Sequence, residues 1–243
     1  MEEDISAIIL AAGQGKRMRV SDVNKVTLPL KNKPMIVHTV DLLLKVGVRK
    51  IFVVVGFAKD SVIQALSRYD IEFVEQLEQK GTGDAVRVAL EKLPKVITDV
   101  FVMQGDDSAF FKPLIIRSLV DTHRSSGAQM TFLTVEMENP AGLGRVVRDD
   151  LGNVIVVVEE KDATDTQRLI TEVNPACYIF KTAFLKKYLP QIKKSDVTGE
   201  YYLTSLIDLA ISHKELIETV VAGPIQWRGV NTLDELHEAE NLL

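Results

Sequence analysis

The chain has 243 residues, of which 46% are hydrophobic and 26% charged, and its 29 basic and 34 acidic side chains leave a net charge of −5. This length allows one or two domains with a large core, and the negative charge disfavours general nucleic-acid binding, which needs clustered Lys and Arg. Cys177 is the single cysteine, which excludes an internal disulfide and a cysteine-cluster zinc site.

The termini and apolar runs show no signal for secretion or membrane insertion. The N-terminus reads Met-Glu-Glu-Asp and then turns apolar for only about six residues, which is too acidic and too short for a secretory signal. No uncharged apolar run reaches the roughly 18 residues that a membrane span needs. We therefore expect a cytoplasmic protein with neither a membrane partner nor a nucleic-acid partner.

In the first half of the chain, short apolar runs alternate with helix-period segments, which is typical of strands joined by crossover helices. The pattern predicts strands over Ile5–Leu10, Ile51–Val55, Ile71–Glu75, Val100–Gln104 and Met130–Val135. It predicts helices from Pro34 to about Val46 and over Asp60–Leu66, Asp84–Leu93 and Pro113–Ser126. The expected fold class is α/β, with a Rossmann-like, mostly parallel but mixed sheet and helices on both faces.

The pattern changes in the second half of the chain. Arg145–Arg148 and Val154–Val158 flank Asp-Asp-Leu-Gly-Asn, which predicts a β-hairpin placed to wall a substrate pocket. Further predictions are strands over Cys177–Phe180 and Ile217–Val221, and helices over Ala183–Leu189, Tyr202–Ser212 and Leu233–Leu242. No repeat or linker interrupts the chain, so we expect one domain over residues 1–243.

The loop after the first predicted strand is the richest segment of the chain. It reads Leu-Ala-Ala-Gly-Gln-Gly-Lys-Arg-Met from Leu10 to Met18, and small residues let backbone N–H groups approach a phosphate closely. Between Ala12 and Pro34 there are six basic residues against Asp22 alone, a local charge of 6 − 1 = +5. This excess predicts polyphosphate binding, and a solvated basic loop is the alternative interpretation.

Several common fingerprints are missing. Gly13-x-Gly15-x-x-Met18 lacks the third glycine of the dinucleotide pattern, and the second predicted strand ends at Val55-Gly56 without a ribose-binding acid. There is no Walker pattern and no Gly-x-Ser-x-Gly elbow, and the four histidines lack metal-ligand spacing. The sequence therefore disfavours a dehydrogenase, a P-loop enzyme and a serine hydrolase.

The Leu10–Met18 loop, followed by Lys25, resembles the signature of the sugar-nucleotidyltransferases, Leu-x-x-Gly-x-Gly-x-Arg-Met and then Lys before Pro-Leu. Similar family motifs recur in order along the chain, at Gln76, 79–85, 105–106, 142–149, 158–164, 172–174, 199–204 and 229–231. Together they are similar to the bacterial uridyltransferase domains that act on N-acetylglucosamine-1-phosphate. Any one motif is weak, but their shared order makes coincidence a poor explanation.

The resemblance implies an enzyme that transfers a nucleotidyl group from UTP to N-acetylglucosamine-1-phosphate with Mg²⁺, giving UDP-N-acetylglucosamine and pyrophosphate. Arg17 would contact the triphosphate, and Lys25 would hold the α-phosphate and the incoming sugar phosphate. Gln76 and Gly81 would read the uracil edge. The remaining nucleotide-binding candidates are Leu10, Ala11, Ala12, Gly13, Gly15 and Thr82.

The resemblance also implies metal and sugar sites. Asp106 and Asn231 would hold Mg²⁺, which usually takes one or two protein oxygens and completes its shell with phosphate and water. Gly144, Glu159 and Asn174 would contact the sugar, and so would Lys161, for which a surface ion pair is the alternative. In this scheme residues of about 1–110 bind the nucleotide, those of about 111–230 bind the sugar, and helix 233–242 closes the chain.

The chain departs from the family pattern at two places. Asp107-Ser108 replace an apolar residue and Pro, which puts the metal preference in question, and Pro175-Ala176 replace a small residue and Gly beside the sugar site. Two alternatives therefore stay open. One is the same reaction class with dTTP or another sugar-1-phosphate, and the other is a non-catalytic regulatory subunit that binds nucleotide sugars. A homo-oligomer is also left open.

Overall fold

The apolar runs of the sequence form one central sheet. The structure, a computed structural model, describes residues 4–18, 22–106, 108–223 and 229–243. In this part of the chain the sheet has ten strands in the order β5-β4-β1-β6-β11-β7-β10-β8-β9, with β12 pairing with β7 outside this path.

The strands of the first half pair in parallel, and they are β1 (Ile5–Ala11), β4 (Lys50–Val55), β5 (Glu72–Glu75) and β6 (Asp99–Gln104). Every residue of β1 is buried, because β1 lies between two strands and helices cover both faces of the sheet. This explains why its sequence is an unbroken apolar run rather than an alternating one.

The strands of the second half extend the sheet and make it mixed. They are β7 (Met130–Glu136), β8 (Gly144–Arg148), β9 (Val154–Val158), β10 (Glu172–Asn174), β11 (Cys177–Lys181) and β12 (Ile217–Val221). β11 lies antiparallel between β6 and β7, and β12 is parallel to β7. Because β9, β10 and β11 alone run against the other strands of this sheet, the predicted mixed, mostly parallel sheet is confirmed for the described residues.

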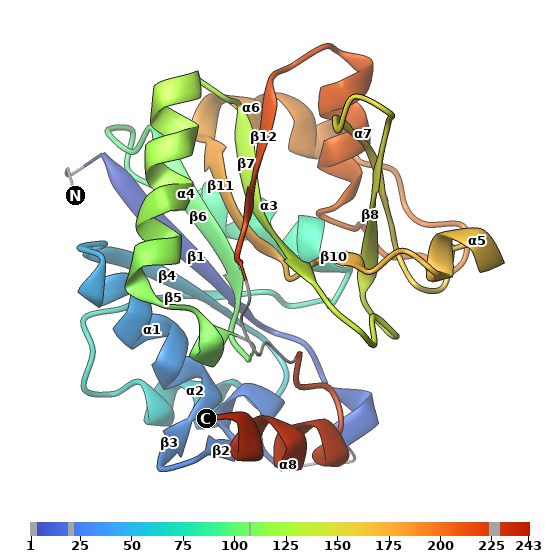
Figure 1. Ribbon diagram of the computed structural model, residues 1–243. Helices are drawn as coiled ribbons and strands as arrows, with labels where there is room; N and C mark the ends of the chain where they lie inside the picture. The colour runs from blue at the N-terminus through green and yellow to red at the C-terminus, as the bar shows by residue number, and fades with distance from the viewer. Residues whose placement is uncertain (1–3, 19–21, 107, 224–228) are drawn as a thin grey trace.

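Helices pack on both faces of the sheet, as predicted (Figure 1). One face carries α1 (Met35–Lys45), α2 (Lys59–Ala65), α4 (Pro113–Ser126) and α8 (Leu233–Leu242). The other carries α3 (Thr82–Leu90), α6 (Thr182–Tyr188) and α7 (Ser205–Ser212). The short helix α5 (Asp165–Arg168) follows the β8–β9 hairpin and has no buried residue.

Local sequence signals set several of these boundaries. Pro113 occupies the first turn of α4, where its missing N–H is not needed, and Gly127 ends the helix with a φ of 71°. The β8–β9 loop contains Gly152 with a φ of 84°, and the N–H of Asp149 donates to the carbonyl of Asn153 at 2.9 Å. The predicted hairpin is therefore confirmed.

Two predicted helices begin two or three residues from the predicted start, where contacts between distant segments hold the chain. α3 starts at Thr82 rather than Asp84, since the N–H of Gly83 donates to the carbonyl of Tyr201 at 2.8 Å. α7 starts at Ser205 rather than Tyr202, and the residues before it form tighter turns, in which the N–H of Leu206 donates to the carbonyl of Leu203 at 3.0 Å. The N–H of Leu203 donates to the Thr82 hydroxyl at 2.9 Å, so this segment is held along the start of α3.

The sequence pattern misses the shortest elements. These are α5, β10, the β2 (Pro29–Leu30) and β3 (Lys33–Pro34) ribbon, and short 3₁₀ turns at 16–18, 25–27, 108–110 and 189–191. Segments of two to four residues carry too little periodicity to show either a helix or a strand. Among the helices of the described ranges, none has the length and apolarity needed to cross a bilayer.

Candidate active site

Two joined cavities lie beside the carboxyl ends of β1 and β6. The smaller cavity measures about 290 Å³ and the larger one about 780 Å³. Their common walls include Leu10, Arg17, Lys25, Asp106, Glu159 and Asn231. Ligands of open α/β sheets gather at this edge of the strands, so the cavities are the natural place for a site.

The loop of residues 10–18, called the glycine loop below, borders the larger cavity. Leu10, Ala11, Ala12, Gly13 and Gly15 all line it, as the sequence analysis expects of a nucleotide loop. A Cβ atom on Gly15 would lie 3.0 Å from carbons of the Lys25 side chain, and the φ of Gly15 is 56°. Only glycine fits this contact comfortably, so the loop and Lys25 stay close together.

Gln76, Gly81 and Thr82 lie on another wall of the larger cavity. Gln76 is buried, and its side-chain amide donates to the Asp84 carboxylate at 2.8 Å and to the carbonyl of Gly81 at 3.2 Å. A Cβ atom on Gly81 would lie only 2.6 Å from the carbonyl oxygen of Tyr201, and its φ is 108°. Glycine is therefore required here, and the turn stays rigid beside the cavity.

A charge cluster forms where the two cavities meet. The Lys25 ammonium pairs with the Asp106 carboxylate and donates to the Asn231 side-chain oxygen at 3.1 Å and the Val230 carbonyl at 3.4 Å. Asp106 is only 7% exposed, so an opposite charge is needed to offset the loss of water around its carboxylate. These three side chains come from the 3₁₀ turn at 25–27, the end of β6 and the segment before α8.

The oxygen pair of Asp106 and Asn231 has the chemistry of a Mg²⁺ site. Both oxygens converge on one positive charge, that of Lys25, and Mg²⁺ prefers such hard oxygen ligands. The described residues include no group of three or more His, Cys, Asp and Glu that could hold a metal, but Mg²⁺ needs only one or two protein oxygens. Asp107, whose extra charge the sequence analysis singled out, lies outside the described residues.

Arg17 reaches across the larger cavity from the glycine loop. Its side chain is exposed, and its Nη1 atom lies 4.0 Å from the point where a Cβ atom on Gly142 would sit. The loop before β8 therefore approaches the glycine loop from the opposite wall. A planar guanidinium in this gap can bridge the oxygens of a bound polyphosphate.

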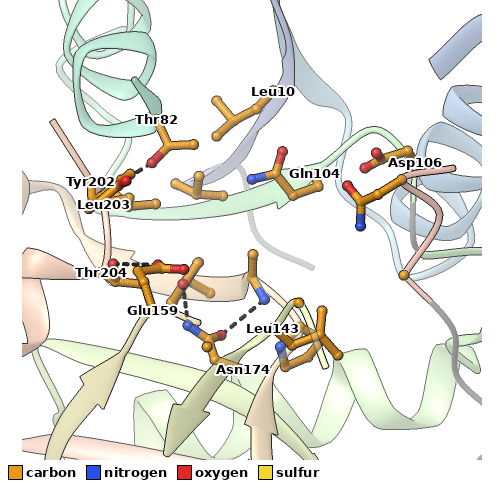
Figure 2. A pocket seen from close by; sticks show the side chains of 18 of the residues that line it. Leu10, Thr82, Gln104, Asp106, Leu143, Glu159, Asn174, Tyr202, Leu203 and Thr204 are labelled. Atoms are coloured by element: carbon orange, nitrogen blue, oxygen red, sulfur yellow. Dashed lines mark hydrogen bonds between the residues drawn. The ribbon is translucent and has the colours of Figure 1, made fainter. Parts of the chain in front are cut away.

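Glu159, Asn174 and Gly144 line the smaller cavity (Figure 2). Glu159 accepts a hydrogen bond from the Thr204 hydroxyl at 2.9 Å, and burial raises the pKa of its carboxyl above the ordinary value although that bond opposes the rise. Asn174 donates to the Tyr178 hydroxyl at 2.5 Å and accepts from the Ala176 N–H at 2.9 Å. These polar groups face Asp106 across the cavity, which suits the recognition of a sugar.

Lys161 differs from the other sugar candidates in bordering only the larger cavity, a wall that it shares with Glu159. Its exposed side chain borders the larger cavity, and it is absent from the walls of the smaller one. Pro175 and Ala176, the residues that depart from the family pattern, line the smaller cavity themselves. Ala176 has a φ of 53°, a left-handed conformation that glycine adopts more easily.

Sequence reasoning also missed residues of the cavity walls. Tyr178 and Gln104 line the smaller cavity, and in Figure 2 Gln104 lies between Leu10 and Asp106. The sequence signal for Gln104 is its position. Every second residue of a strand lies on the same face, so Val102 and Gln104 share one face of β6, and Asp106 continues this spacing beyond its end. A polar residue between an apolar strand residue and a predicted metal ligand therefore indicates a position in the wall of the site.

Comparisons with known proteins show the family of the chain. Residues 6–243 match the family model described as nucleotidyl transferase. The chain is 36% identical over 242 residues to the bifunctional protein GlmU of Psychrobacter sp. (strain PRwf-1), with 99% of this chain and 52% of that protein covered. For GlmU of Geobacillus sp. (strain WCH70), the identity is 39% over 242 residues, with 98% and 51% covered.

The chain thus spans about half the length of the curated relatives that it matches. Among solved structures, it resembles a putative glucose-1-phosphate thymidylyltransferase from Bacillus anthracis in complex with a sucrose. The TM-score is 0.81 at 19% identity, with 98% of this chain and 94% of that chain covered. This likeness shows the fold.

Proposed function

Because this chain belongs to the nucleotidyl transferase family, we propose that it transfers a uridylyl group from UTP to N-acetylglucosamine-1-phosphate. The products are UDP-N-acetylglucosamine and pyrophosphate. The family itself implies a nucleoside triphosphate and a sugar-1-phosphate as substrates. The choice of uridine and of N-acetylglucosamine rests on the motifs from Leu10 to Asn231 and on the similarity to the GlmU proteins.

The observation that carries the proposal is the charge cluster of Lys25, Asp106 and Asn231 at the junction of the two cavities. A transfer between two substrates needs both reacting phosphates at one point. The larger cavity has the glycine loop for a nucleotide, and the smaller one has the polar walls for a sugar. The cluster lies where a phosphate from each side would meet.

The proposed chemistry is an in-line displacement without a covalent enzyme intermediate. An oxygen of the sugar phosphate attacks the α-phosphorus of UTP, a new P–O bond forms, and the bond to the departing pyrophosphate breaks. Such reactions depend mainly on positioning and on neutralising phosphate oxygens. Lys25 neutralises charge at the reacting phosphates, and Arg17 stabilises the pyrophosphate as it becomes more negative.

Mg²⁺ would be held by Asp106 and Asn231, and when bound it would neutralise phosphate charge and align the phosphate oxygens. Asp106 is anchored at the end of β6, while Asn231 precedes α8, whose capping box involves Thr232 and Glu235. The N–H of Asn231 also donates to the Glu235 carboxylate at 2.6 Å. Both residues therefore adjoin regular elements, Asp106 two positions after β6 and Asn231 one position before the N-cap of α8.

On the sugar side, we propose that Glu159 accepts hydrogen bonds from the sugar in the smaller cavity. The Thr204 hydroxyl already orients one carboxylate oxygen. A half-enclosed carboxylate rejects a ligand that leaves it unpaired, which gives selectivity. Because Pro175 and Ala176 border the same cavity, transfer to a different sugar-1-phosphate is the second candidate function.

The deciding experiment measures pyrophosphate release with UTP, dTTP, CTP, ATP and GTP, each combined with several sugar-1-phosphates. We expect the highest kcat/KM for UTP with N-acetylglucosamine-1-phosphate and loss of turnover in EDTA. A higher value with another sugar would establish the second candidate. Nucleotide-sugar binding without turnover on any pair would instead indicate the regulatory subunit, and no binding at all would refute the proposal.

A further inference from the structure

Asn24 lies directly before Lys25 and is fully buried, with 0% of its surface exposed. Its side-chain amide nitrogen donates to the carbonyl oxygens of Ala11 at 2.9 Å and Gly13 at 3.2 Å, both in the glycine loop. The same nitrogen lies 2.9 Å from the carbonyl of Phe57, in the loop after β4. One uncharged side chain therefore holds two loops together beneath the larger cavity.

The other polar groups of Asn24 are also used. Its backbone N–H donates to the Ser61 hydroxyl at 2.9 Å, and its side-chain oxygen accepts from the N–H of Val26 at 3.2 Å. Its carbonyl accepts from the Thr27 hydroxyl at 2.7 Å. Asn24 is thus fixed on all sides, so its amide is a rigid anchor for the glycine loop.

Three consecutive carbonyl groups of the loop, those of Ala11, Ala12 and Gly13, accept hydrogen bonds from outside the loop. The Asn24 side chain donates to the carbonyl oxygens of Ala11 and Gly13, and the N–H of Phe57 donates to the carbonyl oxygen of Ala12 at 3.1 Å. In a planar trans peptide the C=O and the following N–H point in opposite directions. The N–H groups of Ala12, Gly13 and Gln14 therefore point away from these partners, and all three residues border the larger cavity.

We propose that Asn24 is a positioning residue that turns the carbonyls of the glycine loop inward, so that its N–H groups bind the phosphates of the nucleotide. The identity of that ligand rests on the proposed function. A carbonyl oxygen facing a polyanion would repel it, whereas successive N–H groups form an anion site. Asn24 achieves this without adding charge.

The same residue links the loop to Lys25. Asn24 precedes Lys25 in the chain, and the Lys25 side chain packs on Gly15 at the far end of the loop. A loop that is held at Ala11, Gly13 and Gly15 can shift only if the turn that carries Lys25 shifts too. Nucleotide binding and the placement of the Lys25 ammonium are therefore coupled.

The test replaces Asn24 by residues of nearly the same shape. Asn24→Asp removes both N–H donors and places a carboxylate against carbonyl oxygens, and Asn24→Leu removes the hydrogen bonds without adding charge. Calorimetry would measure Kd for UTP and for pyrophosphate alone. We expect Kd to rise about tenfold or more for both ligands, since each lost hydrogen bond releases a carbonyl of the loop.

Ser61→Ala is the matched control, because it removes the bond to the Asn24 backbone but leaves the side-chain amide in place. We expect this variant to bind UTP within about twofold of wild type, even if thermal unfolding shows that it loses as much stability as the Asn24 variants. Hydrogen exchange supplies an independent readout. UTP should slow exchange of the N–H groups of residues 12–14 in wild type and Ser61→Ala, but not in Asn24→Asp.

Wild-type affinity for UTP and pyrophosphate in either Asn24→Asp or Asn24→Leu would overturn the inference. Asn24→Ser, which keeps one donor in a smaller side chain, extends the test if the first two variants do not fold, and wild-type affinity there would overturn it as well. If wild type binds pyrophosphate but not UTP, the proposed function fails, while weaker pyrophosphate binding by Asn24 variants would still support the role of Asn24.

Discussion

Charge compensation around Asp106 defines the site at the scale of single residues. The buried carboxylate is stabilised by the Lys25 ammonium that pairs with it, and the same ammonium also donates to the Asn231 side-chain oxygen. Removing the partner of a buried carboxylate generally costs about 3–5 kcal/mol of stability, because the charge is left without water and without a counter-charge. The same three groups therefore serve the fold of the free protein and the chemistry of the proposed reaction.

Lys25→Ala tests the proposed role of the ammonium. We expect turnover to fall about 100-fold or more, the usual effect of removing one preorganised positive group or donor from a transition state. Pyrophosphate release under saturating substrates measures this. Lys33→Ala is the control, because Lys33 belongs to the same basic segment but pairs with Asp41. Turnover like wild type in Lys25→Ala would remove this residue from the mechanism.

Glu159→Gln should separate stability from activity. Burial raises the pKa of Glu159 above 4.5, partly offset by the Thr204 hydrogen bond. A raised pKa means that the ionised carboxylate lowers stability as pH rises from the unfolded pKa through the folded one. We expect Glu159→Gln to raise Tm at neutral pH and to raise KM for the sugar-1-phosphate about tenfold or more, since a neutral amide accepts fewer hydrogen bonds.

The control for this substitution is Asp162→Asn, an exposed neighbour whose charge contributes to the raised pKa of Glu159. It should leave KM within about twofold of wild type, as surface changes usually do. An unchanged KM in Glu159→Gln would argue against contact with the sugar. A lower Tm in that variant would show that its carboxylate stabilises the fold.

At the scale of elements, an ion pair holds the β8–β9 hairpin against the loop before it. Arg145 on β8 is only 2% exposed, and its guanidinium pairs with Glu160 at 2.7 Å and donates to the carbonyl of Leu143. Glu160 also accepts from the N–H of Gly142 at 3.1 Å. Gly142, Leu143 and Gly144 line the smaller cavity, so this pair shapes its wall.

Glu160→Ala should destabilise the protein more than Arg145→Met does. The first substitution leaves a buried guanidinium without its carboxylate, which costs about 3 kcal/mol, whereas the second leaves a partly exposed carboxylate that water can reach. Urea unfolding of both variants and of the double variant measures the difference. Equal losses for the two single variants would show that the buried charge is compensated by carbonyl groups alone.

The predicted elements show where local sequence suffices. α4 follows its helix signals, with Pro113 at the first turn and Gly127 at the end, and both boundaries are confirmed. The start of α7 was predicted three residues too early, because the local pattern does not show that the preceding segment is held by Thr82, more than a hundred residues earlier. The three residues of β10 are likewise strand only because β7 and β8 lie on either side.

At the scale of the whole molecule, β6 carries charged groups at both ends. Asp106 follows its carboxyl end at the site, and Asp99 begins the strand, where it is buried beside His123 and Lys181. Burial acts to raise the pKa of Asp99, but the His123 ring and the Lys181 ammonium beside its carboxylate hold it at about 2, below 3.8. This second cluster joins β6 to α4 and β11, away from both cavities.

Asp99→Asn tests the contribution of this cluster to acid stability. A depressed pKa contributes stability that is present above pH 4 and is lost as pH falls from about 4 towards 2, by the linkage of protons to folding. A difference between 3.8 and about 2 corresponds to about 2 kcal/mol. Urea unfolding should show a gap between wild type and variant at pH 7 that narrows below pH 4. A gap independent of pH would contradict this assignment.

The family resemblance named Lys25, Asp106 and Asn231 together, and their roles stay predictions. The topology brings the ends of β1 and β6 close to the segment before α8. Lys25, Asp106 and Asn231, far apart in sequence, meet in one cluster. The sequence could not show that Lys161 borders the larger cavity, because the path of the irregular segment after β9 decides where this residue lies. Nor could it show the anchor at Asn24, since a single asparagine before a lysine carries no pattern.

Lys25 and Asn231 meet across 206 positions of sequence, while the last strand that the structure describes ends at Val221. During synthesis a ribosome therefore finishes these strands before it adds the amide that completes the cluster. Proteolytic removal of the segment from 229 onwards would take away Asn231 together with the buried Val230, Leu236 and Ala239. The cluster and part of the core on that face of the sheet would therefore be lost together.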